Sequence, residues 1–273
     1  MKLFKVLFVK ITLVVLLLVN TLSARAANDD SYSEYAHIGS EIIKSVDKLA
    51  TYVGGIKAAL EHESFKQVLV EITTLQVGKI GTIISLFLNN STYWNWFITE
   101  GDLPENVNAT TQVNSGIAVT TLDYNKLKDA TNLSVARTML HEMIHSYLTL
   151  YFQYDGINAK KEYPEVLEAW QVSNNPDYNE IQHTEIENNF VYDIAESLSE
   201  YGQNVGLISV DSSIYRDLSW GGLDFESNNM LTQTDKNRIQ DRINAEQLSI
   251  QFDTQSPVGT QLVSVSNEVL ERQ

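Results

Sequence analysis

The chain has 273 residues, 43% of them hydrophobic and 20% charged, so it is long enough to bury a sizeable core in one large domain or two small ones. It carries 19 basic against 35 acidic residues, a formal net charge of −16. A surface this negative repels phosphate backbones and anionic lipid heads, so we expect no nucleic-acid partner. The absence of cysteine excludes disulfides, thiolate metal sites and cysteine nucleophiles.

Residues 1–26 have the pattern of a secretory signal peptide. Lys2 and Lys5 precede the apolar run Ile11–Val19, and small residues at the positions that a signal peptidase reads favour cleavage after Ala26. The apolar run is far shorter than the roughly 20 residues that span a bilayer, so we expect cleavage and no stable membrane anchor. The mature protein is therefore expected to be secreted or periplasmic.

Residues 27–106 are expected to form a mostly helical N-terminal region. Ser31–Tyr52 and Phe65–Leu75 carry apolar residues at helical spacing, although the second could also form a strand, and Ile80–Leu88 is a further apolar run. Tyr93, Trp94, Trp96 and Phe97 then form an aromatic cluster that could line a cleft, but a place in the core is favoured. The loop Glu100–Asn108 is the expected domain boundary.

Residues 107–230 are expected to form a second domain, a mostly helical α+β fold with a small sheet before its main helix. Gly116–Tyr124 alternates and is β-branched, which predicts a strand. Asn132 is the expected cap of an amphipathic helix over Leu133–Tyr154.

Later segments have weaker patterns. A second helix is expected over Glu180–Tyr201, with Gly202 beyond its end. Residues 231–273 are expected to be a C-terminal extension, with a helical stretch near Asp235–Leu248 and an apolar-alternating end over Gln261–Leu270.

The expected helix over Leu133–Tyr154 contains an HExxH motif, His141-Glu142-Met143-Ile144-His145. Histidines four residues apart lie one above the other on a helix, so both imidazoles can bind one zinc ion. Glu142 can then accept a proton from a metal-activated water. By composition, on the order of 0.01 such motifs would occur by chance, so a pair of surface histidines is a poor explanation.

A catalytic zinc site needs a third protein ligand and an open position for water. Of the three other histidines, His183 is the best candidate, because it aligns with the apolar residues of the helix expected over Glu180–Tyr201. Carboxylates of the same region remain open as alternatives: Glu185, Glu187, Glu162, Glu165 and Glu168. The longer HExxHxxGxxH pattern is absent, which excludes a metzincin.

Residues Ile117–Tyr147 resemble the SprT-like family of HExxH metallopeptidases. The resemblance rests on the strand IAVTTLDYNKL (Ile117–Leu127) and the helix TMLHEMIHSYL (Thr138–Leu148). It extends to secreted members from Bacteroidetes-type bacteria, in which a Trp-Gly-Gly-Leu stretch follows, here Trp220–Leu223.

The resemblance implies that residues 107–230 form a zincin-like catalytic domain. It also implies that His141, His145 and His183 bind zinc and that Glu142 is the general base. Two departures bear on function. The chain has no cysteine for the zinc ribbon that many members carry, and its signal segment and charge argue against a role at DNA.

These observations predict a secreted zinc metallopeptidase that hydrolyses peptide bonds in a peptide or protein substrate. The alternative is a secreted binding module that keeps zinc for stability without catalysis, and the presence of Glu142 argues against it. The residue that stabilises the oxyanion is left open among Tyr192, Tyr201, Tyr215 and Arg216. The Trp220-Gly221-Gly222 stretch fits a loop at a cleft edge and a plain turn equally well.

Overall fold

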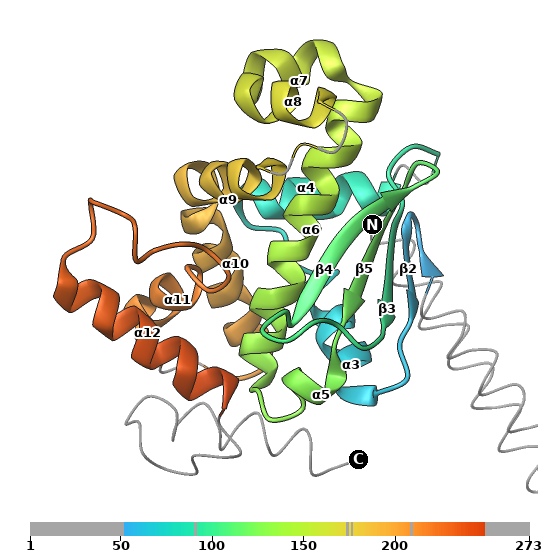
Figure 1. Cartoon of the computed structure of the whole chain (residues 1–273). Coiled ribbons are helices and arrows are strands. Elements are labelled where there is room, and N and C mark those ends of the chain that lie inside the picture. The colour runs from blue at the N-terminus through green and yellow to red at the C-terminus, as the bar shows by residue number, and fades with distance from the viewer. Residues whose placement is uncertain (1–51, 90–91, 173–174, 176, 208–209, 249–273) are drawn as a thin grey trace, which may run out of the picture. The chain divides into compact units, whose positions relative to one another are not determined.

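The computed structural model describes residues 52–89, 92–172, 175, 177–207 and 210–248 (Figure 1). The described residues from Val53 onward belong to one compact unit. Three expectations from the sequence fall outside the described residues: the signal peptide, the helix over Ser31–Tyr52 apart from its last residue, and the apolar-alternating end. None of the described helices is both long and apolar enough to cross a bilayer.

Along the described part of the chain, α3 and α4 lie between β2 and β3, and the other helices follow β5. The strands are β1 (Tyr52–Val53), β2 (Ile56–Ala59), β3 (Trp96–Glu100), β4 (Ala109–Asn114) and β5 (Ile117–Leu122). The helices are α3 (Glu63–Ile72), α4 (Gly78–Asn89), α5 (Tyr124–Leu127), α6 (Asn132–Tyr154), α7 (Gly156–Glu162), α8 (Pro164–Gln171), α9 (Tyr178–Asn189), α10 (Val191–Asn204), α11 (Ser212–Leu218) and α12 (Gln233–Gln247). This confirms a mostly helical α+β fold with a sheet before the HExxH helix.

The sheet is mixed and has the order β2-β3-β5-β4, with the two-residue β1 beside β2. β2, β3 and β5 run parallel, whereas β4 pairs antiparallel with β5 at the edge. A two-residue turn joins β4 to β5, and both of its residues, Ser115 and Gly116, have positive φ as a tight hairpin requires. The alternation in the sequence is confirmed by β5, where Ala118 and Leu122 are buried.

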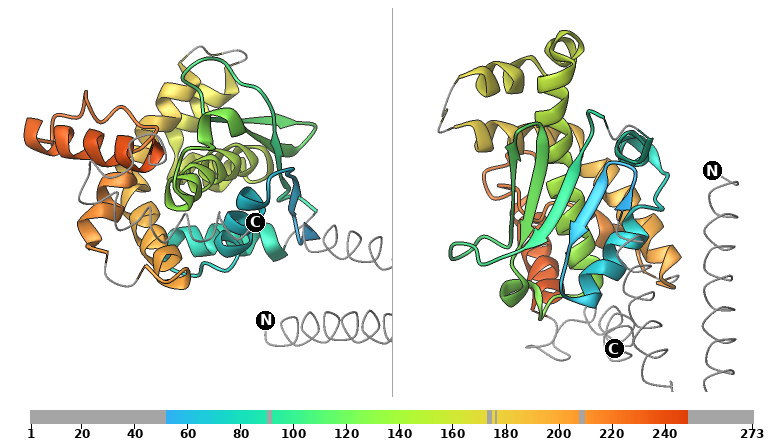
Figure 2. Two further views of the ribbon diagram at one scale, coloured as in Figure 1. Left: turned by 90° about the horizontal axis from the view of Figure 1, so that it is seen from below. Right: turned by 90° about the vertical axis from the view of Figure 1, so that its right-hand side faces the viewer.

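Helix α6 lies at the centre of the helical part and packs against the sheet (Figure 2). It contacts β4 and β5, and it also packs against α3, α10 and α12. Every residue from Asn132 to Leu148 is buried, so the expected amphipathic character is wrong for this stretch. The reason is that a helix enclosed by neighbours has no solvent face, and its polar side chains must find partners inside the protein.

The start of α6 differs by one residue from the prediction. The cap is Thr131, whose hydroxyl accepts a hydrogen bond from the Ser134 backbone N–H at 3.1 Å, and Asn132 is the first helical residue. Thr131 is also held by α12, because its own N–H donates to the Glu246 carbonyl at 2.8 Å. The expected helical stretch near Asp235–Leu248 is confirmed as α12.

The single helix expected over Glu180–Tyr201 is two helices, α9 and α10, separated at Phe190. Phe190 has a φ of −129° and is fully buried against the Tyr163 ring, so core packing interrupts the helical backbone there. The change of direction lets α9 bring its polar residues to α6 while α10 packs its apolar side into the core. Gly202 lies inside α10 and not beyond its end. A glycine is needed there because the Tyr215 hydroxyl occupies the space of a side chain.

Candidate metal centre

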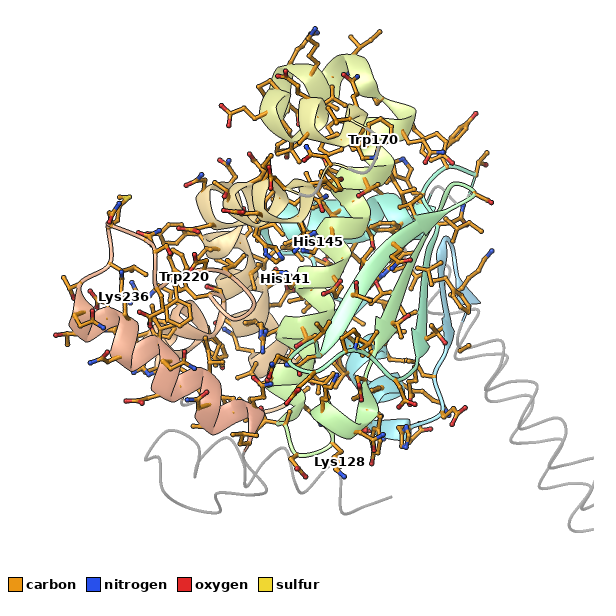
Figure 3. The ribbon with its side chains drawn as sticks, in the orientation of Figure 1. Lys128, His141, His145, Trp170, Trp220 and Lys236 are labelled. Atoms are coloured by element: carbon orange, nitrogen blue, oxygen red, sulfur yellow. The ribbon has the colours of Figure 1, made fainter. Side chains whose placement is uncertain are left out.

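Three histidines from two helices meet beside the middle of α6. His141 and His145 stand on consecutive turns of α6 (Figure 3), and His183 comes from α9. One nitrogen atom of each lies within 4.8 Å of the others, and the Nε2 atoms of His141 and His145 are 3.0 Å apart. His141 and His145 are buried and His183 is partly exposed. The fold therefore brings together the three histidines that the sequence analysis selected from five.

A hydrogen bond from α9 sets the tautomer of His145. The Nδ1 atom of His145 lies 3.0 Å from the Gln182 Oε1, and an amide oxygen only accepts hydrogen bonds. The amide nitrogen of Gln182 donates to the Thr149 hydroxyl at 3.4 Å, which orients the amide. Nδ1 of His145 is thus the protonated nitrogen, and Nε2 presents its lone pair to the centre of the cluster.

All three imidazoles are neutral at pH 7. Burial lowers the pKa of His145 and of His183 to about 4. Burial also brings the pKa of His141 well below its usual range, and its two histidine neighbours and Arg137 act in the same direction. Only neutral imidazole can bind a metal ion, so the site is in the protonation state that a metal requires.

The spacing of His141 and His145 fits two ligands of one tetrahedral metal ion. Two nitrogens that share such an ion at 2.0–2.1 Å lie about 3.3 Å apart, close to the 3.0 Å between the Nε2 atoms of His141 and His145. Three protein ligands leave one tetrahedral position open, which is the ligand number of catalytic and not of structural zinc sites. Imidazole ligands also suit copper, iron and nickel, so the residues define a possible metal site without selecting the metal.

Glu142 is connected to the sheet by a chain of hydrogen bonds. Its Oε2 accepts from the Thr111 hydroxyl of β4 at 2.7 Å, and the Thr111 Oγ1 lies 2.6 Å from the Thr120 Oγ1 of β5. The Trp96 indole N–H of β3 donates to Thr120 at 2.8 Å. Because an ionised carboxylate only accepts, Thr111 donates to Glu142 and accepts from Thr120, which in turn accepts from Trp96. Burial raises the pKa of Glu142 to about 7, while the Thr111 hydrogen bond and the charge of Arg137 oppose that rise.

Arg137 is a buried cation one turn before His141 on α6. Its side chain is 6% exposed, and its Nε has no hydrogen-bond partner among the described residues. Its NH2 group makes one long contact, 3.4 Å to the Ser134 hydroxyl. Burial lowers the Arg137 pKa to about 10, against the attraction of Glu142, so the guanidinium remains charged at neutral pH and adds positive potential near the histidines.

The Trp220-Gly221-Gly222 segment lies against this part of α6. A Cβ atom on Gly221 would be 2.7 Å from the guanidinium carbon of Arg137. Gly222 has a φ of +89°, and a Cβ there would lie 3.3 Å from Cε1 of His141. Both glycines are thus required by a close backbone approach, and in Figure 3 Trp220 lies between α12 and the His141 turn. Of the two readings left open by the sequence, this placement favours a loop at the edge of the site.

The carboxylates that were open as third ligands are placed outside the three-histidine group. Glu185 accepts a hydrogen bond from the Asn189 amide, and Glu162 accepts one from the Tyr151 hydroxyl on another side of α6. Among the oxyanion candidates, Tyr192 is 77% exposed. Tyr201 and Tyr215 are buried in the core, and the Tyr215 hydroxyl donates a hydrogen bond to the Leu207 carbonyl at 3.5 Å.

Thr111, Gln182 and Arg137 were not found by the sequence analysis. Gln182 and Thr111 reach the site only through tertiary packing, because each belongs to a different element from the residue it contacts. Arg137 did leave a signal, since it is a charged residue one turn before His141 on a helix rich in buried apolar residues.

Comparison with known proteins and structures found no relative of this chain. No protein-family model matches the chain, and neither the curated proteins nor the solved structures contain a match. The functional argument therefore depends on the buried histidine site, which is consistent with an HExxH zincin-like centre.

Proposed function

We propose that the protein is a zinc-dependent metallopeptidase of the SprT-like type, with His141, His145 and His183 as zinc ligands. The observation that carries the proposal is the convergence of three neutral histidines, with one of them fixed in its metal-binding tautomer by Gln182. The order of elements also agrees with the resemblance: a strand, the HExxH helix, and a downstream helix that contributes the third histidine.

In this proposal Glu142, Thr111 and Arg137 each have a separate role in the hydrolysis. Zinc, when bound, supplies Lewis acidity toward a water molecule and a substrate carbonyl. Glu142 accepts a proton from the attacking water and later delivers it to the leaving amine. The hydrogen bond from Thr111 holds the carboxylate in one orientation during both transfers. The Arg137 guanidinium adds positive charge beside the reacting groups.

The substrate class follows from the position of β4. This strand is the last of the sheet, so among the described residues one of its edges pairs with no other strand. Thr111 on the same strand contacts the proposed base. An extended peptide can add to such an edge through backbone hydrogen bonds, which would place its carbonyl groups near the histidine cluster. A peptide or protein chain is therefore the proposed substrate.

The proposal is tested with the full chain and the substitutions Glu142→Gln and His183→Ala. Zinc content is measured by mass spectrometry, and cleavage is measured on a pool of peptides. Glu142→Gln should keep about one zinc per chain and lose cleavage, because it removes the base and retains the ligands. His183→Ala should lose or sharply weaken zinc binding.

Glu185→Gln is the matched control, since it changes a polar residue of α9 outside the histidine group and should leave both readouts unchanged. Zinc retained by His183→Ala would move the third ligand to a carboxylate. Zinc bound by the wild type without cleavage of any peptide would favour the zinc-stabilised binding module.

We also propose that the protein is exported. This rests on the charged and apolar pattern of residues 1–26. N-terminal sequencing of the protein recovered from its source should begin at Ala27, and a chain that begins at Met1 would contradict export by cleavage.

A further inference from the structure

A cavity of about 530 Å³ lies on a different side of α6 from the histidines. Tyr147 and Tyr151 of α6 line it, and they are rotated away from the metal ligands because Tyr147 follows His145 by only two residues, about 200° around the helix. Tyr93 and Trp94, which come just before β3, also line it. We call this cavity the tyrosine pocket. The proposed peptidase chemistry makes no use of it.

The walls of the tyrosine pocket are aromatic rings in a continuous stack. Trp94 and Tyr147 are stacked with centroids 5.6 Å apart and planes at 17°, and Tyr147 stacks on Tyr151 at 5.4 Å and 19°. Tyr93 and Tyr154 contact each other at 5.2 Å, and they are 52% and 38% exposed. Trp94 and Tyr147 are almost fully buried. The pocket lining thus combines buried rings, Trp94 and Tyr147, with exposed rings, Tyr93 and Tyr154.

The charged side chains that line the pocket are acidic. Among the described lining residues, Asp155 and Glu162 are the only charged ones and none is basic. Asp155 is engaged as the cap of α7, where it accepts hydrogen bonds from Asn158. Glu162 accepts a hydrogen bond from the Tyr151 hydroxyl at 3.1 Å and forms no ion pair with any described residue. Burial and the nearby carboxylates raise the pKa of Tyr151, so the phenol stays a neutral donor.

Aromatic ring faces and carboxylates both attract a positively charged ligand. The face of an aromatic ring attracts a cation through its quadrupole, and a carboxylate without a basic partner attracts it through its charge. The volume of the pocket lies in the range of small-molecule sites, which is about 300–1,000 Å³. We propose that the tyrosine pocket binds an organic cation, an ammonium or guanidinium group that carries apolar substituents. This site is independent of the metal centre and of the proposed peptidase activity.

Choline and its uncharged isostere 3,3-dimethylbutan-1-ol test the proposal on the full chain at low ionic strength. Binding is measured by calorimetry and by proton NMR of the ligand. Choline should bind, and its N-methyl resonance should shift upfield because ring currents shield protons held over aromatic faces. The isostere has the same shape without the charge, so it should bind at least about tenfold more weakly if the cation–π and carboxylate attractions both act.

Three substitutions locate the binding. Glu162→Gln removes the charge and keeps the shape, and it should weaken choline binding by about fivefold. Tyr93→Leu removes an exposed ring without opening the core and should weaken binding by about two- to fivefold, with a smaller upfield shift. Glu168→Gln, an equal charge change on the exposed side of α8, is the matched control and should leave binding unchanged.

Two further ligands distinguish the source of the cation. The peptide Gly-Gly-Lys-Gly-Gly represents a side chain of a protein partner, and its Gln counterpart is the neutral control. Tighter binding of the Lys peptide than of choline would assign the pocket to a protein side chain, and the reverse would assign it to a free ammonium compound. The proposal is overturned if neither cation binds, if the isostere binds as well as choline, or if a neutral sugar such as cellobiose binds more tightly than both cations.

Discussion

Gln182 illustrates how a single side chain prepares the metal site. It accepts a hydrogen bond from Nδ1 of His145 and thereby leaves Nε2 free for a metal ion. Its amide is held in turn by Thr149. Outer partners of this kind contribute to metal affinity because a ligand that is already oriented loses less freedom on binding. The residue is therefore a positioning residue of the site and is not itself a ligand.

We predict that Gln182→Leu weakens zinc binding by roughly 10- to 100-fold, because the tautomer of His145 is no longer set. Gln182→Glu retains an oxygen acceptor and should bind zinc about as tightly as the wild type, or more tightly. Zinc affinity is measured by competition with a chromophoric chelator. Equal affinities for the Leu and Glu variants would show that the hydrogen bond does not prepare the ligand.

Thr111 orients Glu142 through a hydrogen bond, as Gln182 orients His145. We predict that Thr111→Val lowers kcat by roughly 10- to 100-fold with little change in KM or zinc content, because it removes one hydrogen bond to a charged group at the reacting centre. Thr111→Ser keeps the hydroxyl and should recover most of kcat. If the Ser variant is as slow as the Val variant, packing of the strand is the cause and the hydrogen bond is not.

Helix α9 is held in place by little apolar packing. Gln182 and Ile186 are its only buried residues, so little apolar surface holds it in place. In contrast, α6 is buried along most of its length. A metal ion shared by His183 and the two histidines of α6 would tie the weakly packed helix to the strongly packed one.

Removal of zinc should therefore loosen α9 and leave the sheet unchanged. We predict faster amide hydrogen exchange over Tyr178–Asn189 when a chelator is added, and no change in β3 and β5. His183→Ala should show the fast exchange without the chelator and no further response to it. Global stability should rise with zinc by about 2.7 kcal/mol at a free concentration 100 times the Kd. Protection of α9 that is independent of zinc would contradict this account.

A buried carboxyl group connects the end of α12 to the start of α6. Glu246 of α12 is fully buried, and its Oε2 accepts a hydrogen bond from the Thr131 hydroxyl at the start of α6, at 2.5 Å. Its other oxygen has no partner among the described residues, and Tyr215 of α11 is a further neighbour. Burial raises the Glu246 pKa to about 7, against the Thr131 hydrogen bond.

This shift predicts a pH dependence of the free energy of unfolding. Between pH 4.5 and 7 the folded state holds the Glu246 proton more tightly than the unfolded state, so its contribution falls as pH rises through that window. The full loss is about 3 kcal/mol for a shift of this size. The buried histidines act in the opposite direction, since their lowered pKa values make stability rise with pH.

Comparison with Glu246→Gln isolates the contribution of Glu246, because the histidine contributions cancel in the difference. In urea denaturation at pH 5 and pH 8, the stability of the variant relative to the wild type should increase at the higher pH. A difference that is constant with pH would mean that Glu246 titrates normally in the folded protein.

The local parts of this protein could be predicted from the sequence alone. HExxH is a property of one helix, and the spacing of His141 and His145 follows from 3.6 residues per turn. The β5 strand and the boundaries of α6 followed within a few residues from alternation and turn signals. His183 was selected because few histidines exist and because its helical face was apolar.

The contacts between segments that are distant in the sequence were decided only by the tertiary structure. The bend at Phe190 arises from burial of its ring, which no local pattern records. The contacts of Thr111 with Glu142 and of Gln182 with His145 join residues 31 and 37 positions apart. The unbroken burial of α6 from Asn132 to Leu148 depends on the elements that pack around it. Helix and strand periodicity report only a local preference for one buried face, whereas the partners of a buried polar group are set by how whole elements pack.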